Sequence, residues 1–181
     1  MKIAILLYEG FTALDAIGPY EVLSRLPEAT VHFVAEHSGP QRTDTHSLTL
    51  IAETPLSALP NPDIVVIPGG MVGTFAAAEN PPIRAWVETA HQTSRWTMSV
   101  CTGALILGAA GLLKGLKATT HWFAKDYLAK YGAEYVPERF VQQGKIITAA
   151  GVSAAANVPT IPLCLFYLVS LRPAFRLIYP R

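Results

Sequence analysis

Two short segments of the chain, residues 3–8 and 64–67, are apolar at every position. They read Ile-Ala-Ile-Leu-Leu-Tyr and Ile-Val-Val-Ile, and the second is closed abruptly by Pro68-Gly69-Gly70. A strand with one face in water alternates apolar and polar residues, whereas a strand that is apolar throughout is covered on both faces. Helical patterns separate the strands along the chain, so the sequence predicts an α/β sandwich with a mainly parallel sheet.

The remaining elements are predicted from apolar spacing and from the positions of proline and glycine. Pro19 suits the first position of a helix, and residues 11–18 are expected to form a turn-like connection before it. Gly144 predicts a tight hairpin. A helix over residues 121–131 is expected to bury Trp122, Tyr127 and Leu128. Other predicted elements are a helix at 82–93 and strands at 30–35, 48–52, 63–67, 134–137, 140–143 and 145–149.

Composition limits the partners that such a chain can have. The 181 residues fit one domain spanning 1–181. Only 15% of them are charged, against a usual quarter or so, which indicates that a partner subunit covers some apolar surface. The formal net charge is +1 and no run of Lys or Arg occurs, which argues against a nucleic-acid partner. We therefore expect a homodimer that acts on a small molecule.

Cysteine and histidine usage gives the expected compartment and cofactors. Cys101 and Cys164 do not make a disulfide framework, and the five histidines lack the spacing of a metal site. The apolar run in the first eight residues is too short for a secretory signal. The apolar run Leu163–Leu171 is too short to span a membrane. We expect a cytoplasmic protein without metal, other cofactor or membrane partner. Cys164 is expected to be a core residue.

The stretch from Trp96 to Leu105 has the pattern of a nucleophile elbow. An apolar strand runs into Cys101, and a helix of small residues follows with almost no loop. A thiol there would lie at a helix amino end, which is expected to favour the thiolate. Gly103 would let other backbone or a ligand approach closely. The alternative is that Cys101 is a small buried hydrophobe, as most free cysteines are.

Three loops are expected to meet at the carboxyl edge of the sheet, where open parallel sheets bind ligands. They carry Asp15, the pair Gly69 and Gly70, and the pair Cys101 and Thr102. A carboxylate, two exposed backbone N–H groups and a thiol suit nucleophilic addition. Each has a structural alternative: Asp15 as a helix cap, the glycines as a tight turn, and Thr102 as a helix-start residue. His121 is expected to begin a helix rather than to act as a base.

At these loops the sequence resembles the DJ-1/PfpI (ThiJ) superfamily, and within it the isonitrile hydratases. The resemblance covers about residues 1–155, and the tail from about residue 156 is atypical. The matching segments are Leu14-Asp15-Ala16-Ile17-Gly18-Pro19, Ile67-Pro68-Gly69-Gly70, Ser99-Val100-Cys101-Thr102-Gly103-Ala104, Gly111-Leu112-Leu113-Lys114-Gly115, Ala118-Thr119-Thr120-His121-Trp122 and Gly151-Val152-Ser153-Ala154.

This resemblance implies a flavodoxin-like three-layer sandwich, usually homodimeric, with Cys101 as the nucleophile. It implies that Asp15 is the acidic residue beside the thiol, and that Thr102, Gly69 and Gly70 position the ligand and stabilise negative charge. The PfpI proteases have a histidine directly after the cysteine, and close relatives of DJ-1 have glutamate at the acidic position. Thr102 and Asp15 therefore favour hydration of an isonitrile to a formamide.

Two other functions remain open at this point. AraC-type regulators carry nearly the same domain as a ligand sensor, although their helix-turn-helix region would not fit in this chain. A glyoxalase-like or amide-hydrolysing enzyme would keep the cysteine and change the substrate.

Overall fold

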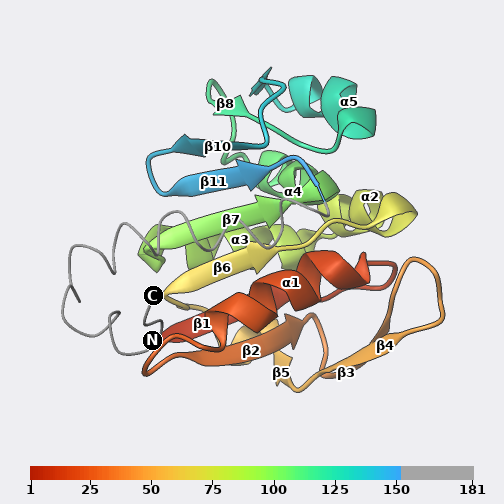
Figure 1. Cartoon of the computed structure of the whole chain (residues 1–181), viewed down its shortest axis with the longest axis vertical. Helices are drawn as coiled ribbons and strands as arrows, with labels where there is room; N and C mark the ends of the chain where they lie inside the picture. The colour runs from red at the N-terminus through yellow and green to blue at the C-terminus, as the bar shows by residue number, and fades with distance from the viewer. Residues whose placement is uncertain (152–181) are drawn as a thin grey trace, which may run out of the picture.

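The computed structural model describes residues 1–151. Its centre is a seven-stranded sheet in the order β10-β11-β7-β6-β1-β2-β5, in which only β10 and β11 pair antiparallel. Figure 1 shows α1 (Ala13–Leu23) in front of this sheet and α3 (Pro81–Thr93) behind it. The strands are β1 Lys2–Leu6, β2 Thr30–Ala35, β5 Thr54–Pro55, β6 Ile64–Ile67, β7 Trp96–Val100, β10 Phe140–Gln143 and β11 Ile146–Ala149.

Helices connect the neighbouring strands β1 to β2 and β6 to β7, and helices cover both faces of the sheet. Ile3–Leu6 and Ile64–Ile67 are at most 1% exposed, which confirms that the two uniformly apolar segments are central strands. The helices are α1 Ala13–Leu23, α2 Met71–Glu79, α3 Pro81–Thr93, α4 Ala104–Ala109 and α5 Lys125–Lys130, with short 3-10 turns η1 Leu56–Ala58, η2 Cys101–Gly103 and η3 Trp122–Ala124. The predicted α/β sandwich with a mainly parallel sheet is confirmed.

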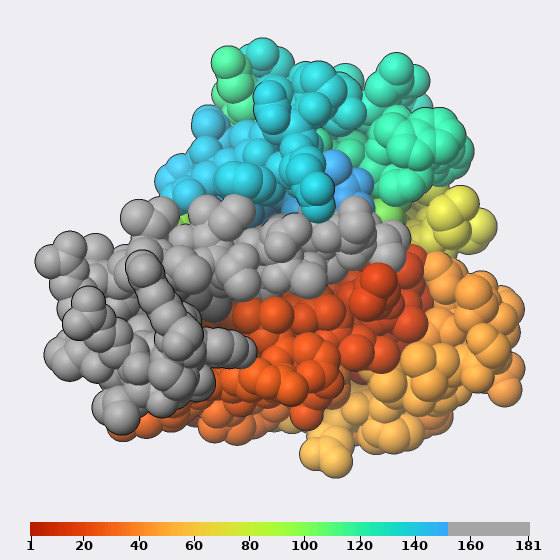
Figure 2. All heavy atoms as spheres, viewed as in Figure 1, coloured from red at the N-terminus to blue at the C-terminus, as the bar shows by residue number. Residues whose placement is uncertain are grey.

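Two small sheets lie outside the central one. β3 Gly39–Arg42 and β4 Thr49–Ala52 form an antiparallel hairpin, and β8 Lys117–Ala118 pairs parallel with β9 Glu134–Tyr135. The turn of the hairpin lies against the loop after β1, because Phe11 and Thr43 form a bridge. In Figure 2 this hairpin (orange) lies beside the amino-terminal segments (red).

The first helix corrects one prediction. α1 begins at Ala13, so residues 13–18 are helical and Pro19 lies inside the helix rather than at its first position. An internal proline removes one intrahelical bond and usually destabilises a helix. Here the burial of Ala16, Pro19 and Leu23 offsets that loss.

The segment after β8 corrects further predictions. Residues 121–131 divide into η3 and α5, and Trp122 and Tyr127 are 72% and 38% exposed, whereas Leu128 is buried as expected. The predicted strand 134–137 is limited to β9, which pairs with β8 and not with the central sheet. The helix over residues 71–79 and the strand over residues 39–42 were not predicted.

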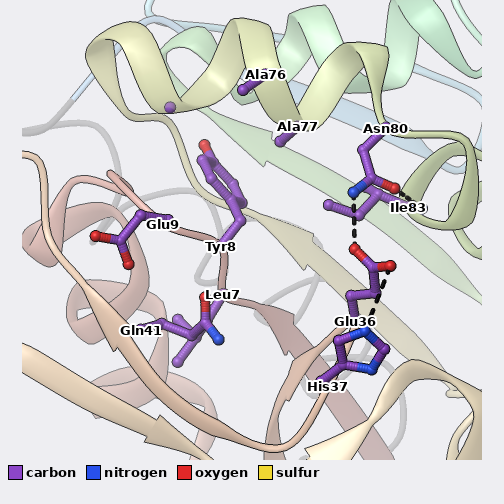
Figure 3. Close-up of a pocket in the computed structure, with 11 residues that line it drawn as sticks. Leu7, Tyr8, Glu9, Glu36, His37, Gln41, Ala76, Ala77, Asn80 and Ile83 are labelled. Carbon is purple, nitrogen blue, oxygen red and sulfur yellow. Dashed lines mark hydrogen bonds and ion pairs between the residues drawn. The ribbon is translucent and has the colours of Figure 1, made fainter.

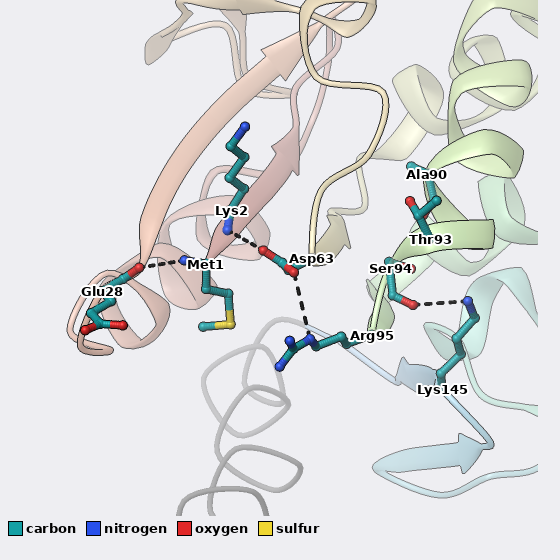
Figure 4. A network of polar contacts seen from close by, with 9 residues as sticks. All are labelled: Met1, Lys2, Glu28, Asp63, Ala90, Thr93, Ser94, Arg95 and Lys145. Carbon is teal, nitrogen blue, oxygen red and sulfur yellow. Dashed lines mark hydrogen bonds and ion pairs between the residues drawn. The ribbon is translucent and has the colours of Figure 1, made fainter.

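The edge of the sheet opposite the carboxyl ends is held by polar contacts (Figure 4). The Lys2 backbone N–H donates to Asp63 Oδ2 at 2.7 Å, and Lys145 Nζ donates to the Ser94 carbonyl at 3.1 Å, at the end of α3. A cation suits a helix carboxyl end, where backbone carbonyls lack helical partners. These contacts stabilise the scaffold and leave the carboxyl edge for ligands.

Within residues 1–151, no helix is long and apolar enough to cross a membrane. Cys164 and Leu163–Leu171 lie outside the described residues.

Candidate active site

Cys101 lies at a sharp turn between β7 and α4. Its φ of +55° lies in the left-handed region, which residues other than glycine rarely adopt and which costs about 1–3 kcal/mol where the surroundings impose it. The Thr120 hydroxyl donates to the Cys101 carbonyl at 2.9 Å and so fixes this turn. The side chain is 7% exposed. The strand-turn-helix arrangement around Cys101 is the one that the sequence predicted.

Asp15 is a buried carboxyl group at the amino end of α1. The residue is 0% exposed, and its Oδ2 accepts the Gly69 backbone N–H at 3.2 Å. Its Oδ1 is buried and has no hydrogen-bond partner among the described residues. Leaving a buried carboxylate oxygen unpaired is costly, so this oxygen marks a place where a proton or a ligand is expected.

Gly69 is the residue at which the three loops meet. A Cβ atom built on it would lie 2.7 Å from Cys101 Cβ, 2.8 Å from Asp15 Oδ2 and 2.8 Å from the Thr102 nitrogen. Those separations are shorter than real Cβ atoms show, so only glycine fits. The thiol and the carboxyl group therefore both occupy the space that a side chain at position 69 would fill.

Burial sets the protonation of the pair. Burial, opposed by hydrogen bonds from Gly69 and Cys101, raises the pKa of Asp15 from 3.8 to about 7. Burial and then the charge of Asp15 raise the pKa of Cys101 to about 12, and the Thr102 backbone N–H opposes this. The expectation that the helix amino end favours the thiolate is therefore wrong. η2 and α4 are short, and desolvation together with a neighbouring carboxylate outweighs their dipole.

The prediction that the Gly69 and Gly70 backbone N–H groups are free to bind a ligand is also wrong. The Gly69 N–H is bound to Asp15, and the Gly70 N–H donates to Thr102 Oγ1 at 3.0 Å. Thr102 Oγ1 further lies 2.8 Å from Thr74 Oγ1, so its hydroxyl is held by the protein. A Cβ on Gly103 would collide with the Ile67 and Pro68 carbonyl oxygens, so this glycine allows the turn to pack on β6 rather than admitting a ligand.

Two residues near the site were missed by sequence reasoning. Tyr8 and Thr74 are buried, and their hydroxyl groups lie 3.0 Å apart. Tyr8 was recognised only as the end of an apolar strand. Its single hydroxyl at that carboxyl end was the available signal. Thr74 lies in α2, which was not predicted.

The other residues singled out earlier are placed as follows. His121 is the N-cap of η3, and its Nδ1 accepts the Phe123 N–H at 3.4 Å, which confirms that it begins a helical turn. Residues 1–151 contain no group of three or more His, Cys, Asp or Glu side chains arranged to hold a metal ion.

A hollow of about 270 Å³ lies beyond the carboxyl ends of β1 and β2, beside α2 (Figure 3). Tyr8 and Gly73 form part of its wall, and Glu36 accepts a hydrogen bond from the Asn80 side chain at 2.8 Å across it. Neither Asp15 nor Cys101 lines it. It is therefore a neighbour of the Cys101 site and not the site itself.

Comparison with known proteins identifies the scaffold. A model of the DJ-1/PfpI family matches residues 1–158. The chain belongs to the DJ-1/PfpI family. This family membership confirms the resemblance seen in the sequence motifs.

Individual family members differ in function. The isonitrile hydratase of Pseudomonas putida is 38% identical over 157 residues, which make up 87% of this chain and 68% of that enzyme. The HTH-type transcriptional regulator CdhR of Pseudomonas aeruginosa is 25% identical over 84% of this chain and 47% of its own length. A solved THiJ/PfpI family protein from Pseudomonas syringae has a TM-score of 0.83 and 33% identity, covering 95% of this chain and 75% of that one. The DJ-1/PfpI fold thus serves both enzymes and regulators.

Proposed function

We propose that this protein hydrates an isonitrile to an N-substituted formamide, with Cys101 as nucleophile and Asp15 as the group that moves the proton. The observation that carries the proposal is the buried Asp15 carboxyl group, whose Oδ1 is unpaired and which lies beside the elbow thiol in the space left by Gly69. The similarity to an isonitrile hydratase supports the choice of substrate.

The first step adds the thiol across the terminal carbon of the isonitrile. Between about pH 7 and 12 the pair retains one proton, mainly on sulfur, because the pKa of Asp15 is about 7 and that of Cys101 is about 12. The Asp15 carboxylate accepts the thiol proton as the sulfur attacks, and the same proton passes to the isonitrile carbon. The product is a thioimidate, S–CH=N–R, and Asp15 is again a carboxylate.

The second step releases the product. Water adds to the thioimidate carbon with Asp15 as general base, and a proton passes to the nitrogen. The C–S bond then breaks, the sulfur leaves with its bonding electrons and recovers a proton through Asp15, and an N-substituted formamide departs. The sum is one isonitrile and one water giving one formamide, without a redox change.

The test is incubation with one alkyl and one aryl isonitrile, with formamide measured by mass spectrometry. We expect turnover by the wild type and by Thr97→Val, which removes a buried hydroxyl group at the far end of β7. Cys101→Ala should give no formamide and no covalent adduct in the intact mass. Turnover by Cys101→Ala at the wild-type rate would refute the proposal.

A ligand sensor is the second candidate. The similarity to CdhR and the burial of Cys101 favour it, since a 7% exposed thiol with a raised pKa is a poor nucleophile until a base acts on it. Saturable binding of an isonitrile, one per chain and without formamide, would support this function. The expected homodimer and the cytoplasmic location remain predictions, and size-exclusion chromatography tests the former.

A further inference from the structure

Three buried hydroxyl groups form a chain next to the candidate active site. Tyr8 follows β1, Thr74 lies in α2 and Thr102 lies in the elbow, and they are 5%, 0% and 1% exposed. Thr74 Oγ1 lies 3.0 Å from the Tyr8 hydroxyl oxygen and 2.8 Å from Thr102 Oγ1. This hydroxyl chain therefore links, through side chains alone, three segments that are far apart in the sequence.

Both ends of this hydroxyl chain are anchored on the turn that contains Gly69. The Tyr8 hydroxyl donates to the Pro68 carbonyl at 2.8 Å, and the Gly70 N–H donates to Thr102 Oγ1 at 3.0 Å. Thr74 Oγ1 also lies within hydrogen-bond distance of the Gly70 carbonyl, so the one Thr74 hydroxyl hydrogen is shared between that carbonyl and the Tyr8 hydroxyl oxygen. Burial raises the pKa of Tyr8, so its phenol stays protonated and remains a donor. The residues on both sides of Gly69 are thus fixed by hydrogen bonds.

Gly69 in turn determines how the two reacting groups meet. Its N–H binds Asp15 Oδ2, and its lack of a side chain leaves room for that oxygen beside Cys101. The hydrogen bonds of Tyr8 and Thr74 run to Pro68, Gly70 and Thr102, so these two hydroxyl groups are not placed to react themselves.

We propose that Tyr8 and Thr74 are positioning residues, which hold the 68–70 turn and Thr102 so that Gly69 keeps Asp15 against Cys101. This inference rests on the proposed function for its kinetic consequence, but its geometric content can be measured without turnover. Loss of either hydroxyl lets the turn relax and weakens the bond from Gly69 to Asp15. Because that bond lowers the pKa of Asp15, weakening it raises the pKa further.

The first experiment follows the thiol and needs no isonitrile. The rate of Cys101 alkylation by iodoacetamide is measured from pH 5 to 9 in proteins that carry Cys164→Ser, so that one thiol reacts. We expect the plot of alkylation rate against pH to show an inflection where Asp15 titrates, and this inflection should be absent from Asp15→Asn. In Tyr8→Phe and in Thr74→Val it should move upward by about half a pH unit or more. Thr74→Ser, which retains the hydroxyl group, should restore the original inflection.

The second experiment uses turnover. In Tyr8→Phe and Thr74→Val we expect kcat/KM for an alkyl isonitrile to fall about tenfold, with a smaller loss in Thr74→Ser, because small displacements of reacting groups are costly. Thr97→Val is the matched control: it removes a buried hydroxyl that bonds His91 and Ser94 and should lower the thermal midpoint without moving the inflection.

The possible outcomes separate the two proposals. If the wild type forms no formamide, the proposed function fails. The pH profile of Cys101 alkylation then still decides whether Tyr8 and Thr74 are positioning residues. If Tyr8→Phe and Thr74→Val leave the inflection where it is and merely unfold at lower temperature, as Thr97→Val should, the positioning role is refuted. Failure of Thr74→Ser to restore the inflection would refute it as well.

Discussion

Replacing Asp15 by asparagine should stabilise the protein at neutral and alkaline pH while removing its proposed chemistry. The pKa of Asp15 is raised from 3.8 to about 7, so between about pH 4 and pH 7 the folded protein holds a proton that the unfolded chain has already lost. Its burial therefore costs nothing below about pH 4, costs progressively more up to about pH 7, and is constant above that. Three pKa units correspond to about 4 kcal/mol, and relaxation around the site reduces the expected gain to about 2–4 kcal/mol.

Urea unfolding of wild type and Asp15→Asn at half-unit steps from pH 4 to 8.5 measures this difference. We expect the two free energies of unfolding to be similar at pH 4 and to diverge by up to about 1.4 kcal/mol per pH unit until pH 7. Asparagine keeps an oxygen that can accept the Gly69 N–H, so the existing hydrogen bond is retained. At pH 8 the thermal midpoint of the variant should exceed that of the wild type by roughly 5–10 °C.

Asp126→Asn is the control, because Asp126 is an exposed residue in the first turn of α5. Its removal should lower stability by about 0.5 kcal/mol through the helix dipole and should not reproduce the divergence expected of Asp15→Asn. If Asp15→Asn is less stable than the wild type at pH 8, or if the difference between them does not change with pH, the assignment of Asp15 as a strained buried carboxylate is wrong.

Three further predictions follow from the same geometry. Gly69→Ala should lower kcat/KM for an isonitrile by about 100-fold or more, because its Cβ would lie 2.7 Å from Cys101 Cβ; a fully active variant in steady-state assays would contradict this. The kcat/KM of the wild type should rise with pH through about 7, as Asp15 becomes the carboxylate that accepts the thiol proton; a profile that falls through pH 7 would show that the protonated acid is the active form. Lys145→Met should lower the free energy of unfolding by about 1 kcal/mol, measured in urea, because Lys145 caps the carbonyls that end α3; an unchanged midpoint would show that this capping contributes nothing.

The local features of the site could be read from the sequence because each is a short-range pattern. A strand that runs without a loop into Cys101, and a strand that stops at Gly69-Gly70, are visible as changes in apolar spacing. Asp15 was found from its place after the first strand, although its helix begins earlier than Pro19 indicated. α2 was missed because Met71–Glu79 is rich in small and apolar residues and shows no polar face.

By itself the sequence determined the layered α/β scaffold, the sharp strand-to-helix turn at Cys101 and the three loops that face one edge of the sheet. These follow from hydrophobic period and turn chemistry, which act over a few residues. Only the tertiary structure decided the charge on the thiol, the engagement of the Gly69 and Gly70 N–H groups and the hydroxyl chain from Tyr8 to Thr102. Those properties depend on how completely water is excluded and on which distant groups share the resulting space, and neither is encoded in any short stretch of the chain.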